Sequence, residues 1–187
     1  MKILIITLWI VTVSAGLGAL WNYENQPGPV GERQQSFAPQ MAAPDTYRLL
    51  LSLHPHCPCS LATGEELGSI LASTGSSLRV QVLLFSPRGE STEWSRSALT
   101  ELLKRYPHTS ISIDEDGQQA ARVGALTSGD VQLFDPAGKL IFHGGITAAR
   151  GHSGDNAGKD AIIAHVLGQP VLSTHTPVFG CRIQDER

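Results

Sequence analysis

Two cysteines separated by a single proline stand in the segment His54-Pro55-His56-Cys57-Pro58-Cys59. The reactive form of cysteine is the thiolate, and the unpaired N–H groups and dipole of a helix N-terminus lower the pKa of a thiol. Pro58 suits the first position of a helix, because the N–H that it lacks would be unpaired there. We therefore expect Cys57 to cap a helix, to accept hydrogen bonds from first-turn amides, and to be the more acidic and more exposed thiol.

A disulfide between Cys57 and Cys59 would close a very small ring. The bond is within reach, since the Cα atoms lie at most ~7 Å apart, but its geometry should be strained and easily reduced. This favours disulfide exchange, in which Cys57 attacks and Cys59 resolves, over a structural cross-link. His54 and His56 add donors or positive charge that would modulate the site. Such chemistry uses a redox-active disulfide and requires no other cofactor.

Two other interpretations of the same segment stay open. His54, His56, Cys57 and Cys59 form a dense cluster of soft ligands suited to copper or zinc, although no second CxxC or HxxxH pair completes a standard zinc site. Alternatively, the thiols are small buried residues of a binding module without redox chemistry. Functional residues concentrate on loops of this kind, which favours a chemical role.

Cys181 is the third cysteine, and an odd count leaves one thiol without an intramolecular partner. The C-terminal tail spans roughly 45 Å when extended at ~3.3 Å per residue, so it can return to the cysteine pair. Phe179 could bury its ring to dock the tail, and Gly180 permits a close approach. We expect Cys181 near Cys57 and Cys59 as a third redox or resolving thiol or as a metal ligand. A tail thiol elsewhere is the alternative.

Short apolar runs alternate with segments of helical periodicity after residue 46. Strands are predicted over Tyr47–Leu53, Arg79–Phe85, Thr109–Ile113, Val131–Phe134 and Lys139–His143, and helices over Cys59–Thr74, Glu93–Tyr106, Gln118–Val123 and Asn156–Leu167. Because Thr63 and Glu66 have capping-box spacing, the first of these helices could instead begin at Thr63. The order of elements, with a hairpin near the end, predicts a three-layer α/β fold with a mixed sheet.

The run from Ile3 to Trp21 contains no charged residue. As a helix it would rise roughly 28 Å, close to the hydrocarbon thickness of a bilayer. Lys2 precedes it and acidic residues follow, which predicts an exported C-terminal part. We favour an uncleaved signal anchor over a signal peptide cut after Val13-Ser14-Ala15, because apolar residues continue to Trp21.

The chain then divides into four parts: an anchor (1–21), a linker (22–45) rich in Gln, Pro, Gly and Ser, a folded domain (46–168) and a tail (169–187). The 187 residues carry a formal net charge of −3, so a strongly basic surface for nucleic acid is not expected. Three cysteines are also too few for a small disulfide-stapled scaffold.

From Tyr47 to Leu167 the chain resembles thioredoxin-fold redoxins, most closely membrane-anchored TlpA/ResA-type thiol-disulfide proteins. The resemblance rests on the cysteine pair after the first strand and on the segments IDEDGQQAARVGAL and VQLFDPAGKLIFHGG. GGITAARGHSGDNAG and TPVFGC also resemble RedB-like thioredoxin-fold proteins. The resemblance implies a thioredoxin-like fold, preceded here by one transmembrane helix. It also implies that the last strand runs toward the cysteine pair, where Arg150 and His152 would stabilise a thiolate or bind an anionic partner. The alternative is a loop that merely caps the last helix, through Ser153, Asp155 or Asn156.

The sequence departs from that family at two places. The family carries CxxC where this chain has Cys-Pro-Cys, and it carries a cis-proline in the stretch that here reads Leu126-Thr127-Ser128-Gly129-Asp130. The missing proline is a substrate-docking element and a guard against metal, so its absence favours the copper alternative, as in Sco-like proteins of the same fold.

Together these patterns predict a thiol-disulfide oxidoreductase anchored in a bacterial inner membrane, with its domain on the periplasmic side. Its expected partners are membrane lipid and a protein thiol or disulfide, and no nucleic acid. A copper- or zinc-binding chaperone and a redox-inactive binding module are the alternatives.

Overall fold

A computed structural model describes residues 2–33 and 45–184. The elements follow in the order α1 (Lys2–Glu24), β1 (Tyr47–Leu53), α2 (Pro58–Thr74), the 3₁₀ helix η1 (Gly75–Ser77), β2 (Leu78–Ser86), α3 (Ala98–Leu103), β3 (Thr109–Glu115), α4 (Gln118–Arg122), β4 (Asp130–Phe134), β5 (Leu140–Gly144) and α5 (Ala157–Val166). The structure reproduces the predicted sequence of strands and helices.

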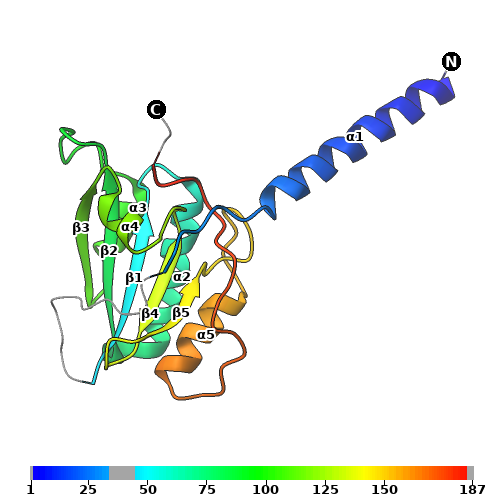
Figure 1. Cartoon of the computed structure of the whole chain (residues 1–187). Helices are drawn as coiled ribbons and strands as arrows, with labels where there is room; N and C mark the ends of the chain where they lie inside the picture. Colours follow the sequence, from blue (N-terminus) through cyan, green and yellow to red (C-terminus); the bar gives the residue numbers. More distant parts are fainter. Residues whose placement is uncertain (1, 34–44, 185–187) are drawn as a thin grey trace.

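The five strands form one mixed sheet in the order β3-β2-β1-β4-β5 (Figure 1). The first three strands are parallel, with Leu51 of β1 opposite Val82 of β2. The hairpin then adds β4 antiparallel to β1 and β5 antiparallel to β4. Only β5 is an edge strand of this hairpin, because β4 lies against the central strand.

Alternating residues of the strands supply two separate cores. Leu49, Leu51 and Leu53 belong to the larger core, together with apolar residues of α2, α3 and α5. Leu50 faces the other way, into a smaller core with Ala120 of α4. Since successive side chains of a strand point to opposite faces, β1 is covered on both sides. The predicted three-layer arrangement is confirmed.

Helix α3 is shorter than the predicted Glu93–Tyr106. It begins after Ser97, whose Oγ accepts a hydrogen bond from the N–H of Thr100 at 3.2 Å. A serine in this position ends the preceding segment and starts the helix. Trp94 consequently lies outside the helix, in a loop that reaches the cysteine segment.

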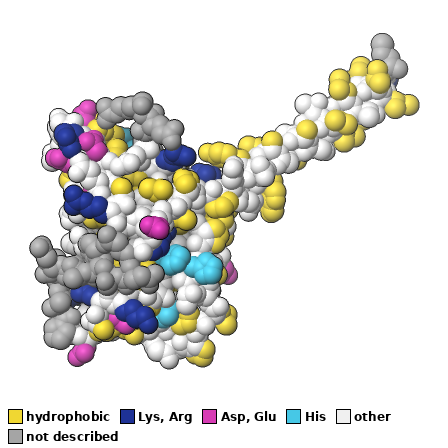
Figure 2. Space-filling view, viewed as in Figure 1, with side chains coloured by type: hydrophobic (Ala, Val, Ile, Leu, Met, Phe, Trp, Pro, Cys, Tyr) yellow, Lys and Arg dark blue, Asp and Glu magenta, His cyan; other side chains and the backbone are white. Residues whose placement is uncertain are grey.

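Hydrophobic side chains are spread along the visible face of helix α1 (Figure 2), and none of the residues of this helix is buried. With 23 residues, the helix is long and apolar enough to cross a membrane. The described part of the predicted linker, residues 22–33, is not a free spacer, because its backbone is bonded to the domain. The N–H of Gly28 donates to the carbonyl of Val178 at 2.8 Å, and the N–H of Gly31 donates to that of Gly124. Residues 28–33 therefore lie against the domain, because their backbone finds partners there.

The C-terminal tail also runs along the domain and returns toward the start of α2 (Figure 1). A β-bridge joins His143 to His175, and a second, antiparallel bridge joins Thr127 to Arg182. Val178 is buried in this segment, as are Phe179 and Ile183. The tail is an integral part of the fold.

Candidate functional site

Cys57 is the N-cap residue of α2, and Pro58 occupies the first turn of the helix as predicted. The N–H of Cys57 donates to the carbonyl of His54 at 3.2 Å. The sequence predicts that first-turn amides donate hydrogen bonds to the Cys57 sulfur. This prediction is wrong, because the Cys57 side chain forms no capping hydrogen bond. The alternative start at Thr63 is also wrong, since its Oγ1 donates to the carbonyl of Cys59 within the helix.

The tail brings Cys181 to the cysteine pair. The Sγ atoms of Cys57 and Cys181 lie 2.9 Å apart, in hydrogen-bond contact across 124 positions of sequence. Beside them, the N–H of Ser128 donates to the carbonyl of Cys181 at 2.8 Å, and the N–H of Ile183 donates to that of Leu126 at 3.0 Å. The predicted proximity of Cys181 is confirmed, and its redox role stays a prediction.

Phe179 and Gly180 dock the tail in the manner expected from the sequence. The Phe179 side chain is buried, and a Cβ on Gly180 would collide with the carbonyl of Ser128. The Arg150 guanidinium donates to the carbonyl of Gly180 at 2.5 Å. Because the peptide on either side of Cys181 is bonded, the third thiol has a fixed position.

The hydrogen bonds among the thiols separate their acidities. The pKa of Cys57 is lowered from 9.0 to about 4, first because the Cys59 thiol donates to its sulfur and further because Cys181 and Ser60 donate to it. Burial opposes this shift. The pKa of Cys59 is raised by the same bond, by burial and by the negative charge on Cys57. These directions agree with the prediction that Cys57 is the more acidic thiol.

The prediction that Cys57 is the more exposed thiol is wrong. Its exposed fraction is 5%, against 8% for Cys59. The tail lies against Cys57 through Cys181, a contact that local sequence does not reveal.

His54 and His56 lie beside the pair within an aromatic cluster. The His54 ring stacks on Phe85 with centroids 4.9 Å apart, and the His56 ring lies 4.4 Å from Trp94. The helix predicted over Glu93–Tyr106 would include Trp94, so the sequence did not indicate this contact. The clustering holds both imidazoles next to the cysteine segment.

Ser60 and Ser128 were also missed. The Ser128 Oγ accepts a hydrogen bond from the N–H of His54 at 2.8 Å and lies 2.6 Å from the Ser60 Oγ. Ser128 stands in the stretch where the resemblance pointed to an absent proline. The absent proline was the only feature of the sequence that pointed to this stretch, and it gave no indication that Ser60 and Ser128 form a hydroxyl network.

Arg150 and His152 do not contact the cysteine sulfurs directly. Arg150 acts on the tail through Gly180, lies over the Tyr23 ring at 5.0 Å, and is the source of a positive charge that lowers the pKa of Cys59 slightly. His152 is exposed and its Nδ1 lies 2.8 Å from the Arg150 carbonyl. The capping interpretation of this loop is confirmed for Asn156, whose Oδ1 accepts from the N–H of Lys159.

The predicted metal ligands do not form a recognisable metal centre. Within residues 2–33 and 45–184, no group of three or more His, Cys, Asp or Glu side chains is arranged to hold an ion. Copper or zinc binding therefore stays a prediction from sequence.

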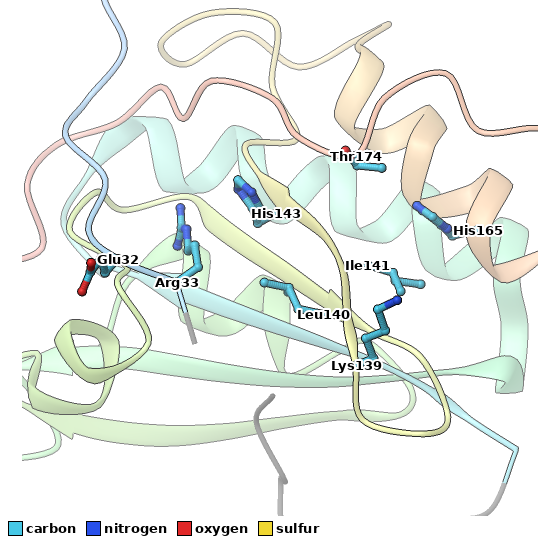
Figure 3. A pocket seen from close by; sticks show the side chains of 8 residues that line it. All are labelled: Glu32, Arg33, Lys139, Leu140, Ile141, His143, His165 and Thr174. Atoms are coloured by element: carbon cyan, nitrogen blue, oxygen red, sulfur yellow. The ribbon is translucent and has the colours of Figure 1, made fainter. Parts of the chain in front are cut away.

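A separate hollow lies on the hairpin side of the domain (Figure 3). Its described lining consists of Glu32, Arg33, Lys139, Leu140, Ile141, His143, His165 and Thr174. None of these is a predicted site residue, and the hollow offers a polar rim without thiols. The cysteines lie elsewhere, at the start of α2 and in the tail that contacts it.

No protein-family model and no curated protein matches the chain. Among solved structures, an uncharacterised conserved protein from Geobacillus kaustophilus has a TM-score of 0.57 at 17% identity, covering 87% of this chain and 92% of its own. A hypothetical protein from Sinorhizobium meliloti has a TM-score of 0.57 at 20% identity, covering 88% and 99%. A secreted disulfide oxidoreductase from Mycobacterium tuberculosis has a TM-score of 0.47 at 13% identity, covering 67% and 83%.

The strand order supports the fold that the resemblance implied. A parallel β1-α2-β2 unit is followed by the antiparallel hairpin beside β1 and by α5, and the cysteine pair begins α2. The chain therefore has a thioredoxin-like fold.

Proposed function

We propose that the protein is a thiol-disulfide oxidoreductase in which Cys57 is the attacking thiolate. The observation that carries the proposal is the contact of 2.9 Å between the Sγ atoms of Cys57 and Cys181 at the start of α2, where Cys59, Cys181 and Ser60 lower the pKa of Cys57. A sulfur with a pKa of about 4 is almost fully a thiolate at neutral pH, and the thiolate is the nucleophile of disulfide exchange. A structural thiol would need no such set of donors.

In the proposed reaction, the Cys57 thiolate attacks one sulfur of a partner disulfide and the other sulfur leaves as a thiolate. A second thiol of this chain then attacks Cys57 and releases the partner. Cys59 is the resolving thiol that the Cys-Pro-Cys pattern predicts, and TlpA/ResA-type proteins are the proposed relatives. Cys181 is a second thiol within reach.

We place the domain on the exported side of a bacterial inner membrane. An apolar helix of 23 residues, α1, supports anchoring by its length and its lack of a polar face. Lys2 lies before it and Glu24 at its end, which favours export of the domain. Sedimentation with membranes after an alkaline wash would support the anchor, whereas release of a shortened chain would support a cleaved signal.

The test of the chemistry is the pH profile of Cys57 alkylation in the full-length protein in detergent. For an activated thiolate, we expect the rate to be nearly constant from pH 5 to pH 8 and to be abolished in Cys57→Ser. The Cys59→Ser variant should retain the modified site. A rate that falls about tenfold per pH unit below ~8.5 would contradict the proposal, because that is the behaviour of an ordinary thiol. Metal analysis of the same preparation tests the copper and zinc alternative.

A further inference from the structure

We propose that Cys181, rather than Cys59, is the resolving thiol, so that the exchanging couple is Cys57 and Cys181. The inference deepens the proposed function and rests on Cys57 being its nucleophile. The observation that carries it is a sulfur–sulfur distance of 2.9 Å between two elements that the fold holds in place.

Cys59 is poorly placed to bond to Cys57. It is the second residue of α2, directly after Pro58, and it follows Cys57 by two positions. A Cys57–Cys59 bond would close a very small ring across Pro58, whose pyrrolidine ring restricts the backbone between the two thiols, so the geometry of that disulfide would be strained. The Cys59 thiol remains protonated, and its role is to donate a hydrogen bond to the Cys57 thiolate.

Cys181 reaches Cys57 without a change in any helix. Its carbonyl accepts from the Ser128 N–H, and the preceding carbonyl, of Gly180, accepts from Arg150. Further bonds hold the tail on both sides, at Val178 through Gly28 and at Ile183 through Leu126. Because these bonds return the tail to one position, the second step is an intramolecular reaction in which the fold orients the Cys181 sulfur toward Cys57.

The electron and proton balance is that of two successive exchanges with a protein disulfide. The Cys57 thiolate bonds to one partner sulfur, and the second partner sulfur leaves as a thiolate that takes up a proton. Cys181 then loses its proton and attacks the Cys57 sulfur, and the first partner sulfur leaves and is protonated in turn. The partner disulfide becomes two thiols, and the Cys57–Cys181 dithiol becomes a disulfide. A dithiol partner reverses both steps.

The tail also covers the nucleophile, since Cys57 is only 5% exposed. A partner disulfide must therefore displace the segment around Cys181 before attack, and the segment must return for resolution. The same tail segment thus both covers Cys57 and supplies the proposed resolving thiol.

The experiment uses the reduced full-length protein in detergent with glutathione disulfide as the probe. Wild-type protein and two matched variants, Cys59→Ser and Cys181→Ser, are quenched with acid at intervals and mapped by mass spectrometry without reduction. In wild type, we expect a peptide that joins Cys57 to Cys181. Cys59→Ser should still form this link, at a rate set by its less stabilised thiolate. In Cys181→Ser, the mixed disulfide between glutathione and Cys57 should persist at least ten times longer than in wild type.

A Cys57–Cys59 link in wild type, or equally rapid loss of the adduct in Cys181→Ser, would overturn the assignment of Cys181 while leaving the proposed oxidoreductase intact. Absence of any glutathione adduct or disulfide at Cys57 in all three proteins would instead contradict the proposed function itself. Mapping of wild type supplies a result that does not depend on how the variants fold.

Discussion

The two thiols next to Cys57 come from different regions of the molecule and support its chemistry in different ways. Cys59 lies in the same helical turn and has the largest effect on the pKa of Cys57, whereas Cys181 comes from the tail and contributes a smaller lowering. The tail, however, carries the sulfur that needs no helical rearrangement to bond. The start of α2 thus sets the acidity of the nucleophile, and the tail supplies its proposed reaction partner.

The largest expected effect concerns the loop that receives the tail. Asp130 begins β4 directly after this loop and is fully buried, with Arg33 donating to both carboxylate oxygens at 2.7 and 2.5 Å. Burial nevertheless raises the pKa of Asp130 from 3.8 to about 6. Folding therefore favours the protonated carboxyl, and this group makes the fold less stable as pH rises from about 4 to above 6.

Replacing Arg33 by Gln would leave that carboxylate without its cation. We expect the unfolding free energy at pH 7 to fall by about 3–5 kcal/mol relative to wild type, since an unpaired buried charge remains. The difference from wild type should shrink as pH falls toward 4, where the carboxyl is neutral in both proteins. Denaturant unfolding of the full chain at pH 7 and at pH 4 measures this difference in unfolding free energy. The double variant with Asp130→Asn should recover most of the loss; an equal loss at both pH values would refute the assignment.

The division of labour between the two thiols can be tested by removing each. Cys59→Ala deletes the strongest donor to Cys57, so its pKa should rise from about 4 toward 9.0. At pH 6, the rate of Cys57 alkylation should fall at least tenfold if that pKa passes 7. Cys181→Ala is the matched control and should cause a smaller rise. A larger rise in Cys181→Ala would reverse the comparison.

Much of the molecule can be predicted from local sequence. Strand β1 alternates its leucines between two cores, and Pro58 marks the start of α2, because periodicity and proline geometry act within a few residues. The burial of Cys57 and the hydroxyl network of Ser128 depend on chain segments that are distant in sequence. Cys181 stands between these cases: an odd cysteine count and a flexible Gly180 made the contact conceivable, but chain reach alone could not choose among the surfaces available to the tail.

A further prediction tests the close approach of the tail. In Gly180→Ala the new Cβ meets the Ser128 carbonyl, so the tail must shift and carry Cys181 away from Cys57. We expect closure of the Cys57–Cys181 disulfide to slow by about tenfold, in line with the usual cost of overpacking. Gly18→Ala is the control, since nothing lies within 4 Å of its added Cβ. Unchanged closure in Gly180→Ala would show that the tail position does not limit the reaction.

The smallest effect is expected at Arg150, which positions the tail through a single hydrogen bond to Gly180. Arg150→Gln should slow resolution of the glutathione adduct by about threefold, because one such bond contributes about 0.5–1.5 kcal/mol and the other tail contacts remain. Formation of the adduct should not slow, since this step uses Cys57 alone and benefits from a looser cover. Arg150→Lys keeps a donor and should restore part of the resolution rate. A variant that slows both steps equally, without rescue by lysine, would indicate a general structural role and would place Arg150 outside the proposed exchange.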